Sequence, residues 1–442
     1  MGDRRRQVAA AGPRPTPPRL ERDLLGELAV PAAALYGIQT VRAIRNLSFS
    51  GKTLGHYPAI IRALAIVKQA AARANRAARV LDARVCAAIE RACQALIAGE
   101  HLDQFPVDVL GGGGSIAINM NLNEVIANLA NEQAGAPRGS YAPVHPKAHV
   151  NASQSTADVC HSAIRIAILH RWTATRAALE ICAGAARAKA AQLRSVIAIA
   201  RTCLQDASPV ALGELFGGHA AAIERRIAAL DRSLEALRQI SLGGTAIGSG
   251  EGAPAAYRRA IIPRLHELTG LRLRRRDNLY DAAQNIDDLA EVAAQFGILA
   301  EVLIKIAQDV RLLASGPDGG FAEIILPSVQ EGSSFFQGKI NPLIAETLLQ
   351  CCFQVLGCER AARLALERGE LDLNVFESSA AINLFDAMDM IERAVPLFAE
   401  LCLTGITANE PRCAALAAGA RFKPQNSRTI VSKSARLDRR SK

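Results

Sequence analysis

The chain has few of the residues that build β-sheets and none of the long apolar runs that cross membranes. Aromatic residues make up only 4% of its 442 residues, with a single tryptophan. Because strands draw on aromatic and β-branched side chains, this shortage favours helix over strand. No segment reaches the roughly 20 uninterrupted apolar residues that a membrane span requires. The arginines near the N-terminus precede no apolar run, so we expect no secretory signal.

Metal and disulfide patterns are also missing. The ten cysteines form no CxxC pair and show no His/Cys spacing typical of zinc. We therefore expect buried thiols in a soluble protein of the reducing cytoplasm. Cys203 could be considered as a nucleophile, but a lone cysteine without a basic partner is more often an inert buried thiol.

The positive charge of the chain lies mostly at its two ends. Of the net charge of +10, residues 1–22 contribute +4 and residues 421–442 contribute +7, which leaves −1 for the rest. The ends are rich in proline and arginine, so we predict that 1–19 and 425–442 are disordered and dispensable for folding. No basic stripe with interleaved aromatics is present, which argues against nucleic acid as a partner.

Hydrophobic periodicity predicts long helices in the second half of the chain. Residues 287–314 contain no proline and one glycine, and precede Ser315-Gly316-Pro317. They therefore predict one long helix. Similar stretches run over 164–204 and 343–367. Such helices are typical of a bundle. The apolar stripe of the first helix consists of Leu299, Val302, Ile306, Val310 and Leu313.

One glycine-bounded stretch concentrates the polar side chains that a catalytic loop needs. Residues 332–341 read GSSFFQGKIN. Glycines give such a loop the freedom to close like a lid. Ser333 and Ser334 supply adjacent hydroxyls, while Lys339 and Asn341 can bind a carboxylate. Taken alone, the stretch also fits an ordinary turn before a helix, with Ser334 or Asn341 as a cap.

This loop resembles the signature loop of the aspartase/fumarase superfamily, GSSxMPxKxN. Phe336 and Gln337 replace the usual methionine and proline. The similar segments occur in the same order as in the family, over about residues 21–412. The residues at 149–156, 373–377 and 405–409 are most similar to those of the aspartase branch. The other similar segments are RDLLGE (22–27), YGIQTVRA (36–43), NMNLNEVIAN (119–128), HVNASQSTAD (149–158), RTCLQDA (201–207) and GGTAIG (243–248).

The resemblance implies an all-α fold with three domains and a long central helix bundle. It places an N-terminal domain over 20–151 and the bundle over 152–409. The third domain would be largely missing, with 410–442 forming a truncated remnant and a basic tail that we expect to be unstructured. The family assembles as a homotetramer in which each active site collects loops from three subunits.

The resemblance also implies a reaction, the elimination of a group from a succinate skeleton to give fumarate, with no metal or organic cofactor. Ser333 would remove the proton next to a carboxylate, aided by positive charge and a helix N-terminus. The resemblance assigns one substrate carboxylate to Ser155, Thr156 and Ser334, and the other to Thr202, Lys339 and Asn341. His149 would shape its loop.

At three positions the sequence differs from the family pattern, and these differences leave the identity of the substrate open. Ala157 stands where the family has asparagine, Cys203 where it has histidine or glutamine, and Ile116 near a usual Thr-Ser pair. These changes remove hydrogen-bonding capacity from a site that should bind an ammonium group. Elimination of ammonia from L-aspartate is the leading hypothesis. The alternatives are a class II fumarate hydratase, a lyase of a substituted aspartate, or a weakly active or inactive structural or regulatory paralogue.

Overall fold

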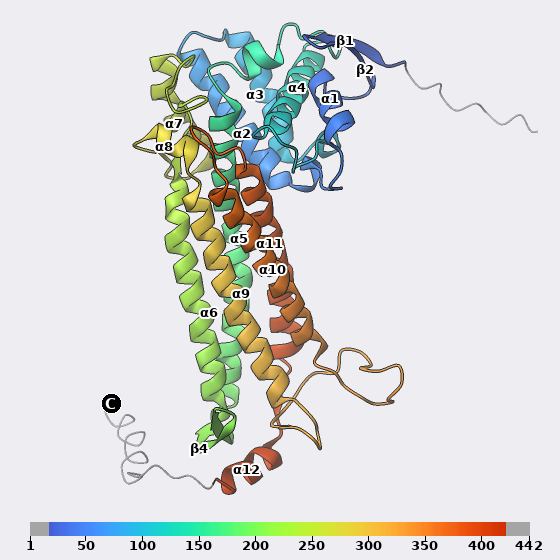
Figure 1. Ribbon diagram of the computed structural model, residues 1–442, viewed down its shortest axis with the longest axis vertical. Coiled ribbons are helices and arrows are strands. Elements are labelled where there is room, and N and C mark those ends of the chain that lie inside the picture. Colours follow the sequence, from blue (N-terminus) through green and yellow to red (C-terminus); the bar gives the residue numbers. More distant parts are fainter. Residues whose placement is uncertain (1–16, 421–442) are drawn as a thin grey trace, which may run out of the picture. The chain divides into compact units, whose positions relative to one another are not determined.

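The computed structural model describes residues 17–420, so most of the two predicted disordered tails lies outside the described residues. The prediction of disorder was wrong for Arg19, because this residue begins a β-strand and its guanidinium donates to the Tyr36 carbonyl at 2.6 Å. The described part is mainly helical, with four small two-stranded sheets, which confirms the all-α fold class (Figure 1). The α-helices are α1 (Ile38–Leu47), α2 (Pro58–Ala77), α3 (Ala83–Ala98), α4 (Ile116–Gln133), α5 (Thr156–Gln192), α6 (Leu212–Leu234), α7 (Ala255–Thr269), α8 (Leu279–Gln284), α9 (Asp287–Leu313), α10 (Leu343–Glu367), α11 (Glu377–Phe398) and α12 (Glu410–Ala418). The strands are β1 (Arg19–Asp23), β2 (Gly26–Val30), β3 (Ile197–Thr202), β4 (Gln205–Ala211), β5 (Gln239–Ile240), β6 (Arg274–Arg275), β7 (Ile324–Ile325) and β8 (Thr407–Ala408).

The chain folds into two compact units, and each is discontinuous in sequence. Within the described residues, unit 1 contains 17–170, 236–287 and 364–382, and unit 2 contains 171–235, 288–363 and 383–420. These units group residues by their contacts within one chain. The division into three domains, with boundaries at 151 and 409, is implied by the resemblance to the family, and it stays a prediction.

Unit 1 packs its helices around α2 and α4. Helix α2 lies against α3 and α7, and small side chains allow the close approach, because Ala63, Ala70 and Ala74 are buried on it. Asp82 caps the start of α3, because its carboxylate accepts the N–H groups of Arg84 and Val85, and the C-cap glycine of this helix is left-handed. The β1–β2 hairpin and the parallel β5–β6 pair also belong to this unit.

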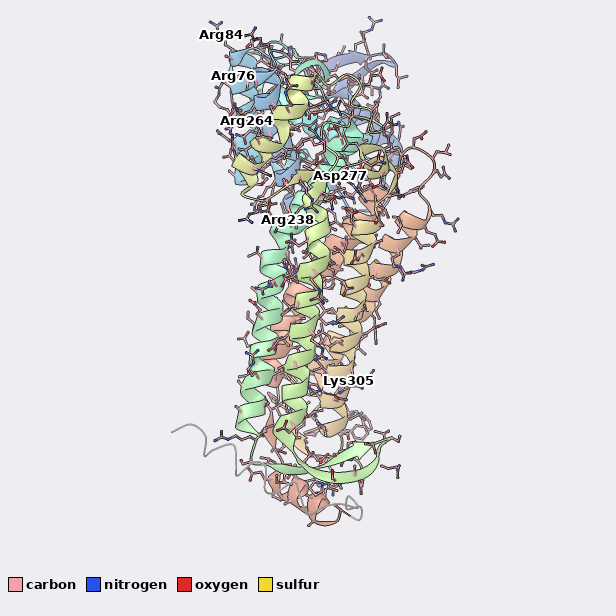
Figure 2. The ribbon with its side chains drawn as sticks, turned by 90° about the vertical axis from the view of Figure 1, so that its left-hand side faces the viewer. Arg76, Arg84, Arg238, Arg264, Asp277 and Lys305 are labelled. Carbon is pink, nitrogen blue, oxygen red and sulfur yellow. The ribbon has the colours of Figure 1, made fainter. Side chains whose placement is uncertain are left out.

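Unit 2 is a helix bundle. Its part of α5 runs beside α6, α9, α10 and α11 (Figures 1 and 2). The predicted range of α10 is confirmed, and α9 ends at Leu313, one residue before its predicted end and two residues before Ser315. Leu299, Ile306 and Val310 are buried as the stripe requires, and Leu303 joins them.

Two expectations about secondary structure were wrong. The predicted helix over 164–204 ends at Gln192, because residues 197–211 form the β3–β4 hairpin instead. The stretch after 409 is not without structure, since α12 forms over Glu410–Ala418 and packs against β3. Asn409 caps α12 by accepting the Arg412 N–H, and Pro411 occupies its first turn, where a missing N–H costs nothing.

None of the described helices combines the length and the apolar character that a membrane-spanning helix needs.

Candidate active site

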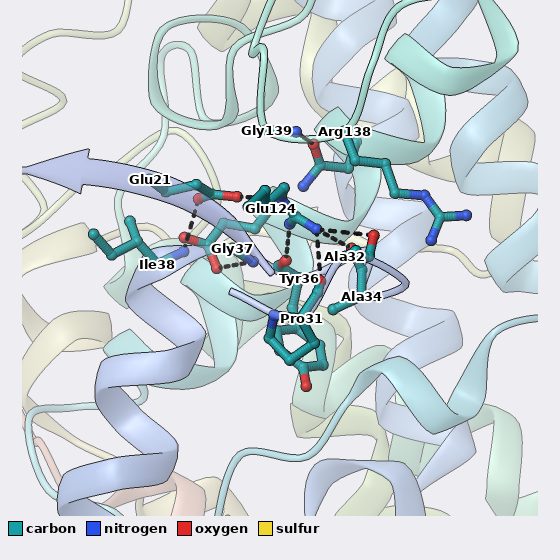
Figure 3. A network of polar contacts seen from close by, with 12 residues as sticks. Glu21, Pro31, Ala32, Ala34, Tyr36, Gly37, Ile38, Glu124, Arg138 and Gly139 are labelled. Carbon is teal, nitrogen blue, oxygen red and sulfur yellow. Dashed lines mark hydrogen bonds and ion pairs between the residues drawn. The ribbon is translucent and has the colours of Figure 1, made fainter. Parts of the chain in front are cut away.

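Two of the sequence motifs meet at the N-terminus of α1 in unit 1. Helix α1 has no capping side chain of its own, because its N-cap is Gly37. Glu124 of α4 instead accepts the N–H groups of Gly37, Gln39 and Thr40 at 2.8–3.1 Å, and Glu21 accepts that of Ile38 at 2.9 Å. Figure 3 shows the contacts of the two carboxylates with Gly37 and Ile38. Two carboxylates thus satisfy the free N–H groups and the positive end of the helix dipole. Burial raises the pKa of Glu124, and these hydrogen bonds oppose the shift.

The predicted substrate residues Ser155 and Thr156 lie at the start of α5, also in unit 1. The Ser155 N–H donates to the Asp158 carboxylate at 2.9 Å, and the Thr156 hydroxyl accepts from the Asn119 amide at 2.9 Å. Both side chains are half-buried. The preceding turn is fixed by His149, whose Nδ1 accepts the His145 N–H at 2.9 Å, so His149 shapes its loop as predicted.

A hollow of about 410 Å³ opens beside Ser155. One wall comes from the turn before α5 and the other from the glycine-rich segment after β5. Its size suits a small organic molecule. The lining residues are Ser153, Gln154, Ser155, Thr245, Ala246, Ile247, Ser249, Glu251 and Gly252.

A second hollow of unit 1, about 490 Å³, is basic but contains none of the predicted site residues. It lies between α2, α3 and α7 and is lined by Arg73, Arg76, Ala77, Glu90 and Arg264; Arg76 and Arg264 are labelled in Figure 2. Glu90 already pairs with Arg73 at 2.8 Å.

The signature loop lies in unit 2 and is closed by its own backbone. The Gly332 N–H donates to the Lys339 carbonyl at 2.9 Å, and the Asn341 amide donates to the Gly332 carbonyl at 2.6 Å. A Cβ on Gly332 would lie 2.5 Å from the Lys339 oxygen, so this position requires glycine. Lys339 is exposed and makes no ion pair with any of the residues described.

Ser333 is held in a particular electrostatic setting within this loop. Its Oγ accepts the backbone N–H groups of Phe335 at 3.0 Å and Phe336 at 2.8 Å. Two such donors stabilise negative charge on an oxygen. The two phenylalanine rings pack edge to face at 4.9 Å and stay largely exposed.

Thr202 ends β3 and pairs with Gln205 across a two-residue turn in unit 2. The turn residues Cys203 and Leu204 both have positive φ, 54° and 59°, as a type I′ hairpin requires. The expectation that Cys203 is buried was wrong, because a two-residue turn projects it into solvent. Most of the other cysteines are buried.

The predicted site residues thus form two groups. Unit 1 holds Ser155 and Thr156 together, and unit 2 holds Thr202 on its hairpin and the remaining residues on one loop. Sequence reasoning missed Asp158, Asn119 and Lys68, which contact or support the first group. The repeated asparagines of NMNLNE were a usable signal, because buried amides on a helix need partners.

Among residues 17–420, no group of three or more histidine, cysteine, aspartate or glutamate side chains is arranged to hold a metal ion.

The helical bundle and the signature loop together define a lyase fold, and comparison with known proteins agrees. The family model described as "Lyase" matches residues 26–357, so the chain belongs to this lyase family. The aspartate ammonia-lyase of Pseudomonas fluorescens is 43% identical over 396 residues, which span 89% of this chain and 83% of that protein. The aspartate ammonia-lyase of Bacillus subtilis is 41% identical over 89% of this chain and 82% of its own length.

Solved structures show the same similarity. A fumarate lyase:delta crystallin from Brucella melitensis, bound to cobalt, aligns with a TM-score of 0.89 at 43% identity, covering 90% of this chain and 87% of that one. A class II fumarase from Schistosoma mansoni aligns with a TM-score of 0.87 at 28% identity, over 90% and 87% of the two chains.

Proposed function

We propose that this chain is a carbon–nitrogen lyase that eliminates ammonia from L-aspartate to give fumarate. The observation that carries the proposal is the setting of Ser333, an intact signature-loop serine whose Oγ receives two backbone N–H donors. Relatives at about 40% identity named aspartate ammonia-lyase support the choice of substrate.

In the proposed mechanism, the Ser333 alkoxide removes a proton from the β-carbon of aspartate. The electron pair passes into the adjacent carboxylate, which Ser155, Thr156 and Ser334 would hold as a doubly charged aci-carboxylate. The electrons then form the Cα–Cβ double bond while the Cα–N bond breaks. Ammonia leaves, and Ser333 keeps the proton until solvent removes it. The other carboxylate would be bound by Thr202, Lys339 and Asn341.

A substituted aspartate is the second candidate substrate. Ala157 follows directly after Thr156 and has no polar side chain with which to contact a free ammonium group. A substrate with a larger, less polar leaving group would suit this position better.

We further propose that the protein assembles as a homotetramer and that its active sites combine unit 1 residues of one subunit with unit 2 residues of others. Large apolar side chains are exposed on the bundle helices of unit 2 in the single chain. They support this assembly, because exposed apolar surface is typical of sites at which proteins bind one another. Examples with more than a third of the side chain exposed are Ile181, Ile298, Phe353, Leu397 and Leu401. We also propose that it works in the cytoplasm, where ten free thiols stay reduced.

An absorbance assay for fumarate tests the function, with aspartate, malate and argininosuccinate offered separately to the full chain. We expect turnover with aspartate. We expect Ser333→Ala to lose turnover by roughly a thousandfold or more while still binding succinate in calorimetry, because the carboxylate contacts are other residues. Ser195→Ala, at an exposed serine of unit 2, is the matched control. Full turnover in Ser333→Ala would remove the base assignment, and absence of turnover with every substrate would favour the inactive paralogue.

A further inference from the structure

Asp158 joins two segments of unit 1 that are far apart in the sequence. It lies in the first turn of α5 and is 2% exposed. One carboxylate oxygen accepts the Ser155 N–H at 2.9 Å. The other accepts the N–H groups of Gly243 and Thr245, both at 3.0 Å. Three backbone donors therefore converge on a single buried carboxylate.

The two segments that Asp158 joins form opposite walls of the 410 Å³ hollow. Ser153–Ser155 line one wall, and Thr245–Gly252 supply the other. Asp158 itself does not line this hollow. The carboxylate thus accepts a backbone N–H from one residue of each wall without lining the hollow itself.

The backbone of both walls needs such an external restraint. Ser153 has a φ of 59° and Thr245 has a φ of 58°, and both are non-glycine residues in the left-handed region. This conformation is costly and persists only where surrounding contacts enforce it. The N–H of Thr245 is one of the Asp158 donors, so the carboxylate supplies part of that restraint.

The charge of Asp158 is balanced from several elements. Burial raises the pKa of Asp158 to about 6, opposed by the three N–H donors and by the Lys68 ammonium of α2. The other titratable groups facing it are the Cys160 thiol of α5 and the Tyr257 phenol of α7, and burial raises the pKa of both, so they stay neutral. The carboxylate is ionised at neutral pH and becomes protonated in mild acid.

We propose that Asp158 is a positioning residue that holds the Ser155–Thr156 turn at a fixed distance from the Gly243–Thr245 loop, so that the hollow fits one carboxylate of a four-carbon substrate. The inference rests on the proposed function, because it assigns that carboxylate to Ser155 and Thr156. Asp158 touches no substrate atom and acts through the backbone of its neighbours. Protonation removes an acceptor oxygen and releases one wall.

Asp158→Asn tests the proposal, with Asp82→Asn as the matched control. Asp82 is also an aspartate that accepts two backbone N–H groups at a helix start in unit 1, but its donors, Arg84 and Val85, belong to neither wall of the hollow. In Asp158→Asn an amide NH₂ faces backbone N–H donors. We expect kcat/KM for aspartate to fall about tenfold to a hundredfold, in line with a lost charge-assisted hydrogen bond.

The pH profile separates positioning from a merely structural role. In the wild-type protein we expect kcat/KM and succinate affinity to decline as pH falls through about 6. In Asp158→Asn that acid limb should disappear, whereas Asp82→Asn should keep it. Hydrogen–deuterium exchange adds a readout that needs no turnover, because the amides of Ser155, Gly243 and Thr245 should exchange faster in Asp158→Asn. If the variant does not fold, exchange at the same three amides is measured in the wild-type protein above and below pH 6. After correction for intrinsic exchange rates, we expect these amides to exchange faster below pH 6.

The outcomes distinguish the two proposals. If the wild-type protein shows no lyase activity but Asp158→Asn accelerates exchange at the three amides and weakens succinate binding, the positioning role holds and the proposed function fails. If the wild-type protein turns over aspartate and Asp158→Asn keeps both kcat/KM and the acid limb, the positioning role is overturned and the proposed function stands.

Discussion

Lys68 is a fully buried cation whose hydrogen-bond acceptor is an amide rather than a carboxylate. Its ammonium donates to the Asn151 side-chain oxygen at 2.8 Å, and the amides of Asn119 and Asn123 donate to the same oxygen at 3.1 Å. Burial lowers the pKa of Lys68 from 10.5 to about 7, opposed by the charges that Cys160, Asp158 and Cys93 would carry. A neutral acceptor offsets little of the cost of burying an ammonium group.

The pH dependence of stability should reveal this lysine. Because its folded pKa is lower than its unfolded pKa, the unfolded chain binds the proton more tightly between these two values. The free energy of unfolding therefore carries no penalty from Lys68 above pH 10.5. The penalty grows as pH falls below 10.5 and is complete once pH has fallen through about 7. We expect urea unfolding to show the wild-type protein gaining stability relative to Lys68→Met between about pH 7 and about pH 9.5. Lys305→Met, at an exposed lysine of α9, is the control, and an equal slope in both variants would contradict the assignment.

The sequence could predict the signature-loop residues but not Lys68 or Asp158. Ser333 and Lys339 belong to one contiguous motif, so the order of its residues is enough to identify them. Lys68 lies between Val67 and Gln69 in a helical stretch, and the neighbouring residues do not indicate that its side chain is buried. Two of the three N–H donors to Asp158, those of Gly243 and Thr245, come from a segment 85 and 87 residues away. Pairings over such distances follow from packing, which a single sequence does not display.

At the scale of elements, α1 depends on a carboxylate from another helix. Glu124 on α4 accepts three backbone N–H groups of the α1 start and the Thr40 hydroxyl at 2.7 Å. A Cβ on Gly37 would meet the Tyr141 oxygen at 2.0 Å, so the turn has no room for a capping side chain. The helix start is consequently specified from outside the helix.

Glu124→Gln should destabilise the protein by about 2 to 3 kcal/mol, because an amide NH₂ would face buried N–H donors. Glu132→Gln is a control on the same helix, since Glu132 is nearly half exposed and pairs with Arg138 on the surface. Such surface pairs contribute about 0 to 1 kcal/mol. Chemical denaturation of both variants measures the difference, and equal free energies of unfolding would contradict the capping role.

Element boundaries were predictable where local signals were strong. The Ser-Gly-Pro sequence ended α9 as expected, and α10 began directly after Pro342. The β3–β4 hairpin was missed because its turn, Cys203-Leu204, lacks the asparagine or glycine that usually marks positive φ. The alternation of Ile197 and Ile199 with alanine was too short to separate strand from helix.

At the scale of the whole molecule, assembly is the property that a single chain leaves open. The bundle helices of unit 2 expose Phe353 at 53% and Ile181 at 55% of their surfaces. Burying such side chains against other copies would contribute about 1.5 to 3 kcal/mol each.

Light scattering should give a mass close to four times 46.9 kDa. Phe353→Glu should shift the protein towards smaller species and reduce activity in proportion, because the proposed active sites combine residues of several subunits. Gln354→Glu adds the same charge at the neighbouring exposed position and should leave assembly unchanged. A monomer of the wild-type chain at micromolar concentration would contradict the tetramer.

The discontinuity of the two units has a consequence for how the protein is made. A ribosome releases Asp158 85 residues before Gly243, and the last segment of unit 1, Leu364–Ile382, follows more than a hundred residues later still. Unit 1 cannot close before its segment 364–382 has been made, and unit 2 cannot close before the segment that starts at 383 has been made, so apolar helices emerge before their partners exist. The nascent chain therefore depends on protection from aggregation until nearly all of it has been translated. For the same reason, no single cut in the gene yields a fragment that contains one complete unit and nothing else.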